Sequence, residues 1–379
     1  MDPKSIFGSD YDTFEEKDPF HPGNVVSGFI SKKSNEYYGA LIITKINGNE
    51  VPEQLIMGSP KMHYPFTSRD DGTRKYNFPM TSKGLYNKIE AYEKLDGTNI
   101  LGYSYTDGKN KFVSFKTRLR PFLNEGSKWG KFFSMWNEAS EGYQHNIELF
   151  ILNNNINLSF ELYGARNPHL VMYKVPLAFA LLFGVTNTGN IWPLSMISIE
   201  LPTAKLIKLI DRDYVWNYEQ LREELNNGLS QIEDGFYTGS EGSVWYFFHS
   251  AGKCVQLKCK PDKIEAIHFS AGAGGLSRNI VLATCWNAFE NTDTLTIEFI
   301  KQLLTEEFNP NIVEAKHDLI ESCMNFVTRE ADFRNEVLER YTNTGKNILL
   351  DKAEVMRSLS SFYPRGQMKK VYSIIAGYA

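Results

Sequence analysis

The stretch Glu93–Asn99, with the sequence Glu-Lys-Leu-Asp-Gly-Thr-Asn, is the part of the chain that decides the fold. Its lysine stands directly before an Asp-Gly turn, and an apolar run that favours a strand follows the turn. The glycine lets a ligand come close to the backbone. A lysine amine is a nucleophile when it is neutral, so its pKa must be lowered by burial or nearby positive charge. Taken alone the pattern is weak, because a hairpin turn with an exposed lysine also produces it.

Downstream elements in a fixed order strengthen the hypothesis of a lysine nucleophile. A strand-like run that ends at Phe115 leads into the basic residues 116–120, about twenty residues beyond the lysine. Further on, Glu161 lies inside the apolar run Leu158–Gly164. A buried carboxylate is costly unless it is paired, hydrogen-bonded or bound to a metal. We therefore expect Glu161 to take part in a site.

Two more elements complete the pattern. The pair Glu241-Gly242 leads into an apolar strand, and alternation along Val255–Pro261 places Lys258 and Lys260 on one strand face. Two such lysines repel each other unless an anion lies between them, and two glutamates beside a triphosphate suit Mg²⁺ or Mn²⁺. We expect a site of phosphoryl-type displacement, in which the metal and both lysines neutralise phosphate charge and lower the pKa of Lys94.

Length and composition bound the class of protein. The chain has 379 residues, of which 42% are hydrophobic and 13% aromatic, so it can form two or three domains and is not disordered. It lacks an apolar run of about 20 residues and a signal-peptide core, so we expect a cytoplasmic protein without a membrane partner. The net charge of −4 excludes a globally basic nucleic-acid binder but allows a local positive groove. The cysteines and histidines have no metal-site spacing, and we interpret the cysteines as ordinary thiols.

The patterns along the chain predict an α+β fold with three parts. Residues 1–80 predict a β-rich N-terminal module with a hairpin turn at Asn47-Gly48. Residues 81–265 alternate short β-rich runs with helical stretches, which indicates antiparallel sheets flanked by helices. Helical periodicity dominates residues 266–379, so we expect an all-helical C-terminal domain.

The ordered elements between about residues 90 and 261 resemble the motifs of the covalent nucleotidyltransferase superfamily of ligases and mRNA capping enzymes. In this resemblance, Lys94 takes the place of the AMP-bearing lysine of motif I. Arg118 matches the arginine at the end of the following basic strand. Phe160–Gly164 matches motif III, which implies that Glu161 lies near the ribose, and Glu241 matches the metal-facing acid of motif IV.

The resemblance extends to the phosphate and base contacts. Lys258 and Lys260 match the motif V lysines that hold the α-phosphate. Leu177–Phe183 loosely matches motif IIIa, which supplies an aromatic ring against adenine. Phe179 and Phe183 would share one strand face there, and the sequence does not choose between them. The cofactors implied are ATP and Mg²⁺ (or Mn²⁺), with the metal on Glu161 and Glu241. The implied nucleotide-binding residues are Glu93, Gly97, Asn99, Arg118, Glu161, Phe179, Phe183, Lys258 and Lys260.

Within the superfamily the chain looks most like ATP-dependent RNA ligases. Glu93 and Asn99 are typical of them, and residues 164–168 are similar to the Gly-x-x-Asn-Pro of archaeal circularising RNA ligases. Residues 280–379 predict helices, whereas DNA ligases and capping enzymes append an OB barrel there. The resemblance implies joining of RNA 5′-phosphate and 3′-hydroxyl ends through lysyl-AMP and an RNA-adenylate. Arg118, with the Lys116–Arg120 cluster around it, is the candidate for gripping the RNA 5′-phosphate.

Several alternatives stay open at this point. A DNA ligase or a GTP-dependent capping enzyme would share the lysine chemistry but differ in its nucleotide or polynucleotide. A catalytically inactive RNA-binding relative would have lost the nucleophile or a motif V lysine, and Lys94, Lys258 and Lys260 are all present. The archaeal group also raises a homodimer as a partner, and a viral chain would act in the host cytoplasm.

Overall fold

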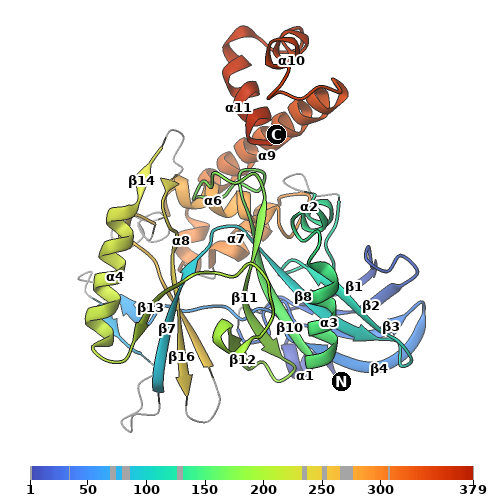
Figure 1. Cartoon of the computed structure of the whole chain (residues 1–379), viewed down its shortest axis with the longest axis vertical. Helices are drawn as coiled ribbons and strands as arrows, with labels where there is room; N and C mark the ends of the chain where they lie inside the picture. Colours follow the sequence, from blue (N-terminus) through green and yellow to red (C-terminus); the bar gives the residue numbers. More distant parts are fainter. Residues whose placement is uncertain are drawn as a thin grey trace.

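The computed structural model describes residues 2–378 except 34, 69–73, 79–85, 126–130, 233–236, 250–253, 265–275 and 306–307. Over these residues the fold is mixed α+β, as predicted, with antiparallel sheets in the N-terminal and central parts and mainly helices after them (Figure 1). The expected domain boundaries, after residues 80 and 265, fall outside the described residues. No helix in the described part of the chain is long and apolar enough to cross a membrane.

The N-terminal part is an antiparallel meander followed by a small hairpin. The predicted turn is present: Asn47 and Gly48 have φ angles of 53° and 76°, and a two-residue hairpin loop of this kind requires positive φ at both positions. Ile43 of this sheet packs with Tyr103 of the central part in one buried cluster, so the meander rests on the central part. The elements are α1 (Pro3–Phe7), β1 (Tyr11–Lys17), β2 (Val25–Ser31), β3 (Leu41–Ile46), β4 (Asn49–Ile56), β5 (Phe66–Ser68) and β6 (Arg74–Tyr76).

The central part contains two larger antiparallel sheets. One has the strand order β12-β11-β10-β8-β9 and the other the order β13-β7-β16-β17, and buried residues such as Tyr92, Phe183 and Tyr246 pack in one cluster between them. The strands are β7 (Tyr86–Lys94), β8 (Thr98–Thr106), β9 (Lys111–Lys116), β10 (Ile156–Tyr163), β11 (Ala178–Thr186), β12 (Ile191–Pro193), β13 (Leu206–Ile210), β16 (Gly242–His249) and β17 (Cys254–Cys259). A minor pair, β14 (Ser230–Gln231) and β15 (Tyr237–Thr238), and a 3₁₀ turn, Leu194–Met196, complete this part.

The strand order brings the motif residues together. Strand β7 ends at Lys94 and β8 begins at Thr98, so the turn between them passes from one central sheet to the other. On one side, β10 pairs with β8 so that Glu161 lies opposite Asn99. On the other side, β16 pairs with β7 so that Gly242 lies opposite Lys94. Residues that are far apart in the sequence therefore meet at the junction of the sheets.

Helices cover the central sheets. Two of them, α2 (Phe132–Ala139) and α3 (Gln144–Asn154), pack on the first sheet, where the Trp136 ring lies 4.9 Å from that of Phe115 and 5.1 Å from that of Phe160. On the second sheet, α4 (Tyr214–Gly228) places the Tyr218 ring 5.4 Å from that of Trp245. These aromatic contacts form the cores that hold the strands in place.

The C-terminal part is organised around one long helix, α9 (His317–Asn343). Its first half packs with α6 (Arg278–Ala288), α7 (Ile297–Thr305) and α8 (Pro310–Glu314) next to the central sheets. Its second half packs with α10 (Lys352–Leu359), the 3₁₀ turn Arg365–Gln367 and α11 (Met368–Tyr378), which project away from the rest of the molecule (Figure 1).

Replacing Trp136 by Ala should destabilise the central part strongly, because its ring is fully buried among Phe115, Phe160 and Phe179. The expected loss in the free energy of unfolding is about 3–5 kcal/mol, measured by chemical denaturation. Trp216→Ala is the matched control, since the Trp216 side chain is 60% exposed and its loss should change the stability by no more than about 0.5 kcal/mol. Equal losses in both variants would contradict this account of the core.

Candidate active site

A cavity of about 330 Å³ opens at the junction of the two central sheets. Its wall contains Lys94, Glu241 and all of the residues implied to bind nucleotide except Phe179. Besides the central strands, the wall includes the N-terminal segment 59–62 and residues of α6, α7 and the turns that follow them. The residues collected here from the sequence motifs are Glu93, Gly97, Asn99, Arg118, Glu161, Phe183, Lys258 and Lys260.

Glu241 joins two lysines in the wall of the cavity. Its carboxylate forms ion pairs with Lys94 Nζ and with Lys260 Nζ, the second at 2.7 Å from Oε1. Glu241 is only 4% exposed, so these charges interact where water screens them poorly. Burial would raise the pKa of Glu241, but Lys260 and Lys94 outweigh it and hold the pKa at about 2. Glu241 is therefore ionised and keeps both ammonium groups in place.

The protein groups around Lys94 raise its pKa by themselves, whereas the sequence argument predicted a lowered pKa with a metal ion and the motif V lysines acting together. Burial lowers it, but the negative charges of Glu241, Glu161 and Asp96 together raise it above its ordinary value. The prediction counted a metal ion beside the lysines of motif V and gave no weight to the negative charge of the carboxylates on the amine. With these groups alone around it, Lys94 is an ammonium at neutral pH, and it becomes nucleophilic only if more positive charge enters the cavity.

The turn after Lys94 is fixed by a carboxylate and by a glycine. The backbone N–H of Gly97 donates to Glu161 Oε1 at 3.0 Å. A Cβ atom at Gly97 would lie 2.3 Å from the carbonyl oxygen of Leu162, so a larger residue would push the turn away from β10. On the same strand pair, the Asn99 amide donates to Ser159 Oγ at 2.9 Å. These contacts set the position of the turn relative to β10.

Glu161 and Glu241 are the residues to which the resemblance assigns a divalent cation. Burial raises the pKa of Glu161 to about 8 in spite of the positive charge on Lys94 nearby, so its ionised form would be stabilised by a further cation. Among the described residues, no group of three His, Cys, Asp or Glu side chains could hold a metal ion. Carboxylate oxygens such as those of Glu161 and Glu241 suit a hard cation like Mg²⁺, which usually keeps several waters and also binds substrate phosphates.

The basic strand end has two roles. Arg118 lines the cavity, and its guanidinium carbon lies 5.2 Å from the centre of the Tyr38 ring. Lys116 is instead buried, and its Nζ donates to the carbonyl oxygens of Gly39, Thr117 and Arg118 at 3.0, 2.8 and 2.8 Å. Lys116 therefore stabilises the backbone, and its inclusion among the residues that would grip RNA is wrong.

The two phenylalanines of β11 face opposite sides, against the prediction that they share a face. Phe183 pairs with Ser159 but Leu181 pairs with Phe160, so Leu182 is an extra residue that forms a β-bulge. The bulge reverses the alternation along the strand. Phe183 consequently lines the cavity, whereas the second ring of the motif, Phe179, packs in the core beneath α2.

Residues 167–173, which follow the motif III strand, pack against the turn after Lys94. The backbone N–H of Val171 donates to Asp96 Oδ2 at 2.7 Å, and the N–H of Asp96 donates to the Tyr173 hydroxyl oxygen at 2.8 Å. The Asn167 amide donates to Thr98 Oγ1 at 3.0 Å. The sequence analysis named Asn167 only as part of the Gly-x-x-Asn-Pro pattern at residues 164–168. In the structure its side chain connects this segment to the start of β8.

Polar residues beyond α6 also reach the cavity. Glu290 Oε1 accepts a hydrogen bond from the Thr98 hydroxyl at 3.0 Å and lies 3.5 Å from His169 Nε2. Asn291 Oδ1 accepts from the backbone N–H of Leu119 at 3.0 Å. The sequence analysis missed these residues, because no motif marks polar side chains in a turn between helices. The helical part is thus a wall of the site.

The structure is similar over most of its length to ATP-dependent RNA ligases. It aligns with an archaeal ATP-dependent RNA ligase, form 2, at 15% identity over 86% of this chain and 77% of the other, with a TM-score of 0.47. It aligns with form 1 of an archaeal ATP-dependent RNA ligase at 14% identity over 99% of this chain and 94% of the other, with a TM-score of 0.46. The alignment with Naegleria gruberi RNA ligase with PPi has 12% identity, covers 69% of this chain and 98% of the other, and has a TM-score of 0.34. No protein-family model matches the sequence, and no curated protein matches it. The likeness describes the fold alone.

Replacing Glu241 by Gln should lower the pKa of Lys94, because it removes one of the negative charges that raise this pKa. Only a neutral amine reacts with cyanate, so carbamylation of Lys94 in metal-free buffer should begin at lower pH in the variant than in the wild type. Mass spectrometry of the Lys94 peptide between roughly pH 7 and 11, where lysines titrate, measures this shift.

Lys109 is the internal control for the same samples, because it is exposed in the turn between β8 and β9, away from Glu241. Its reaction should follow the same pH dependence in both proteins. If the Lys94 profile were also the same in both, Glu241 would not set the state of the amine.

Proposed function

We propose that this chain is an ATP-dependent RNA ligase that joins RNA 5′-phosphate and 3′-hydroxyl ends through a lysyl-AMP intermediate. The observation that carries the proposal is the chain of ion pairs from Lys94 through Glu241 to Lys260 in the cavity wall. It sets an amine beside a second cation in a poorly solvated place. Transfer of a nucleotide to an amine needs this arrangement, since positioning and electrostatics contribute most to such displacements.

In the first step, Lys94 Nζ attacks the α-phosphorus of ATP. Lys94 first loses a proton to water, so that its nitrogen has a free electron pair. A nitrogen–phosphorus bond then forms, the bond from the α-phosphorus to the bridging oxygen breaks, pyrophosphate leaves with the electron pair of the broken bond, and the nitrogen gives a second proton to water. Lys260, held next to Lys94 by Glu241, neutralises the α-phosphate. A divalent cation on Glu161 and Glu241 would supply the positive charge that lowers the pKa of Lys94 and stabilises the leaving group.

One end of the cavity suits the adenine base. Phe183 lies there with Tyr92 and Val244, and together they give an apolar and partly aromatic surface for a flat ring. Glu93 also lines the cavity, but its carboxylate accepts a hydrogen bond from the backbone N–H of Lys205 at 2.8 Å. We therefore assign Glu93 to holding the strand edge beside the base, and Phe183 to stacking.

The later steps use the same cavity. AMP passes from Lys94 to the RNA 5′-phosphate, so that the nitrogen–phosphorus bond breaks and a phosphoanhydride forms. The RNA 3′-hydroxyl then attacks the activated 5′-phosphate, a phosphodiester forms and AMP leaves. Arg118 lines the cavity near Tyr38 and is our candidate for holding the 5′-phosphate. The helical wall from α6 and α7 is in keeping with the resemblance to RNA ligases, whose C-terminal part is helical, and so supports RNA as the acceptor.

Incubation with Mg²⁺ and ATP labelled at the α-phosphate should place label on the denatured wild-type protein. Lys94→Ala should reduce this label on the order of a thousandfold, because the attacking atom is removed. Lys109→Ala is the control, since this exposed lysine is outside the cavity and its loss should leave labelling unchanged. An unlabelled wild type would favour the inactive relative, and undiminished label on Lys94→Ala would end the assignment of the nucleophile.

A substrate panel separates the RNA ligase from its nearest alternatives. With ATP, the protein should seal RNA ends that carry a 5′-phosphate and a 3′-hydroxyl, offered as single strands and as nicked duplexes. Sealing of nicked DNA alone would indicate a DNA ligase. Label from GTP in place of ATP, together with transfer to a 5′-diphosphate end, would indicate a capping enzyme.

A further inference from the structure

Residues 57–64 of the N-terminal part form a segment that runs along the edge of the cavity. Strand β10 holds the first end of this segment. The Asn157 amide donates to the carbonyl oxygen of Met57 at 2.9 Å. Two residues on, the Ser59 and Ser159 hydroxyls form a hydrogen bond at 3.2 Å. These contacts are buried, so they attach the segment firmly to the first central sheet.

The other end of the segment runs along β17 in the second sheet. The backbone N–H of Lys258 donates to the carbonyl oxygen of His63 at 2.9 Å, and the Lys258 ammonium lies 4.3 Å from the centre of the Tyr64 ring. Lys61 lies between the two attached ends, and it lines the cavity together with Lys258. Because both ends are held, the backbone at Lys61 is fixed relative to β17.

Lys61 and Lys258 act on a common neighbour. Burial lowers the pKa of His63, and the positive charges of Lys61 and Lys258 lower it further. Both ammonium groups are therefore close enough to one imidazole to affect its charge. Lys61 and Lys258 also both line the cavity, so their charges favour an anion there that carries more than one negative charge.

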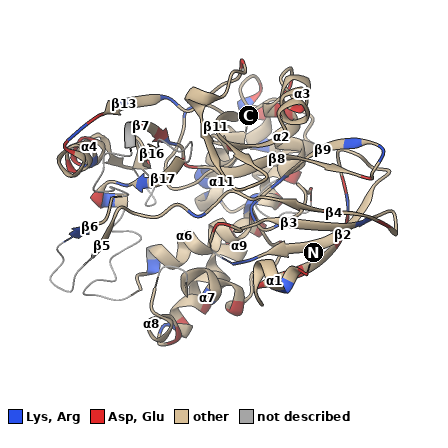
Figure 2. Ribbon diagram, turned by 90° about the horizontal axis from the view of Figure 1, so that it is seen from below, with Lys and Arg blue, Asp and Glu red and all other residues tan. Residues whose placement is uncertain are grey.

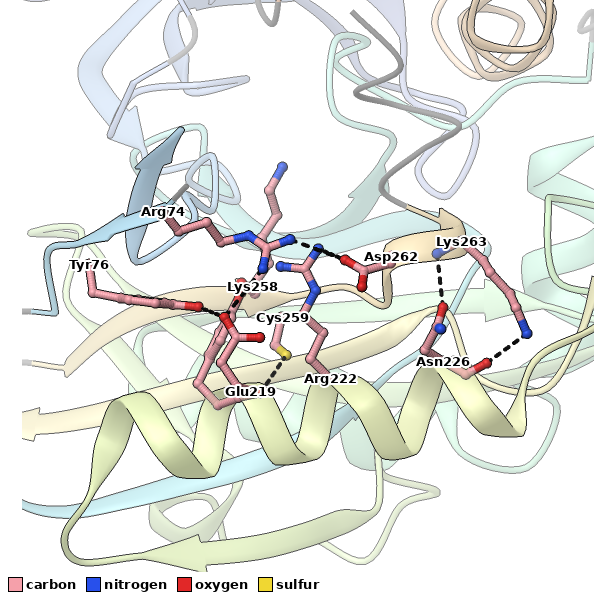
Figure 3. A network of polar contacts seen from close by, with 10 residues as sticks. Arg74, Tyr76, Glu219, Arg222, Asn226, Lys258, Cys259, Asp262 and Lys263 are labelled. Atoms are coloured by element: carbon pink, nitrogen blue, oxygen red, sulfur yellow. Dashed lines mark hydrogen bonds and ion pairs between the residues drawn. The ribbon is translucent and has the colours of Figure 1, made fainter. Parts of the chain in front are cut away.

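A polar network fixes the hairpin β5–β6 beside Lys258 (Figure 3). Arg74 of β6 pairs with Glu219 of α4 at 3.3 Å and with Asp262 at 3.1 Å, and Arg222 of α4 shares Asp262. In Figure 3 the Lys258 side chain rises next to Arg74 and points away from α4. The network pairs these carboxylates with arginines and connects β6 to α4 and to Asp262, which follows the strand that carries Lys258.

We infer that Lys61, with Lys258, binds the β- and γ-phosphates of the nucleoside triphosphate and then the leaving pyrophosphate; this inference rests on the proposed function. Lys260 is paired with Glu241 beside Lys94, so the α-phosphate takes that place. The remaining phosphates extend toward Lys258 and the segment that carries Lys61. When the α-phosphorus bonds to Lys94, the electron pair of the broken bond passes to pyrophosphate, and the two ammonium groups neutralise its charge.

This assignment makes Lys61 a contributor to the first step alone. AMP on Lys94 and adenylated RNA have no β- or γ-phosphate, so the groups that Lys61 binds in the first step are absent from the later steps. A residue that merely supported the fold, or that held RNA, would act on the later steps as well. The two roles can therefore be separated by measuring the steps individually.

The experiment compares Lys61→Ala with the wild type in two assays. The first is single-turnover formation of the protein–AMP adduct at varied ATP concentration, and the second is sealing of chemically pre-adenylated RNA without ATP. Loss of one charged phosphate contact should reduce the first reaction about tenfold to a hundredfold, with weaker inhibition by added pyrophosphate. Sealing of pre-adenylated RNA should stay within about twofold of the wild type, and Lys61→Arg should recover much of the first step.

Lys75→Ala is the matched control, because Lys75 is an exposed lysine of the same N-terminal part and does not line the cavity. It should behave as the wild type in both assays. Equal losses of Lys61→Ala in the two assays, or a loss confined to sealing, would overturn the inference, as would an unchanged first step. A wild type that forms no adduct would instead overturn the proposed function itself.

Discussion

The double ion pair of Glu241 with Lys94 and Lys260 is the interaction on which the rest of the site depends. A buried charge cluster of this kind contributes little net stability, because desolvation offsets most of the attraction. Its position follows from the sheet: β16 lies between β7 and β17, and a Cβ at Gly242 would lie 2.3 Å from the carbonyl oxygen of Cys259. Glycine therefore lets the strands approach closely at the point where the three charged side chains meet.

Each of the three parts of the chain contributes to the cavity. The central sheets supply the nucleophile and its partners, the N-terminal segment supplies Lys61, and the turn after α6 supplies Glu290. Hydrogen bonds rather than chain continuity hold these pieces together, for example from Asn157 to Met57 and from Leu119 to Asn291. The N-terminal and helical parts thus cannot be described as appendages of a complete catalytic unit.

The sequence was sufficient for features that depend on local pattern. The Asp-Gly turn after Lys94 and the apolar runs around Glu161 and after Glu241 predicted strands and turns that the structure contains. Prediction from the sequence failed where a side chain's position or environment depends on contacts with residues far away in the chain. The bulge at Leu182 turns Phe179 away from the cavity, and the carbonyl groups around Lys116 bury its amine. The carboxylates near Lys94 raise its pKa, an effect that the sequence argument had left out. Glu290 carries no sequence signal, since its role arises only from the packing of the helices.

Locating the nucleotide on the protein tests the central claim most directly. The wild-type protein is incubated with ATP and Mg²⁺, digested, and examined by peptide mass spectrometry under conditions that preserve the phosphoramidate bond. The account predicts a mass increase equal to one AMP moiety on the peptide that contains Lys94, with the modified atom assigned to Lys94 by fragmentation. AMP found on Lys61, Lys258 or Lys260 instead, or on no residue at all, would contradict it.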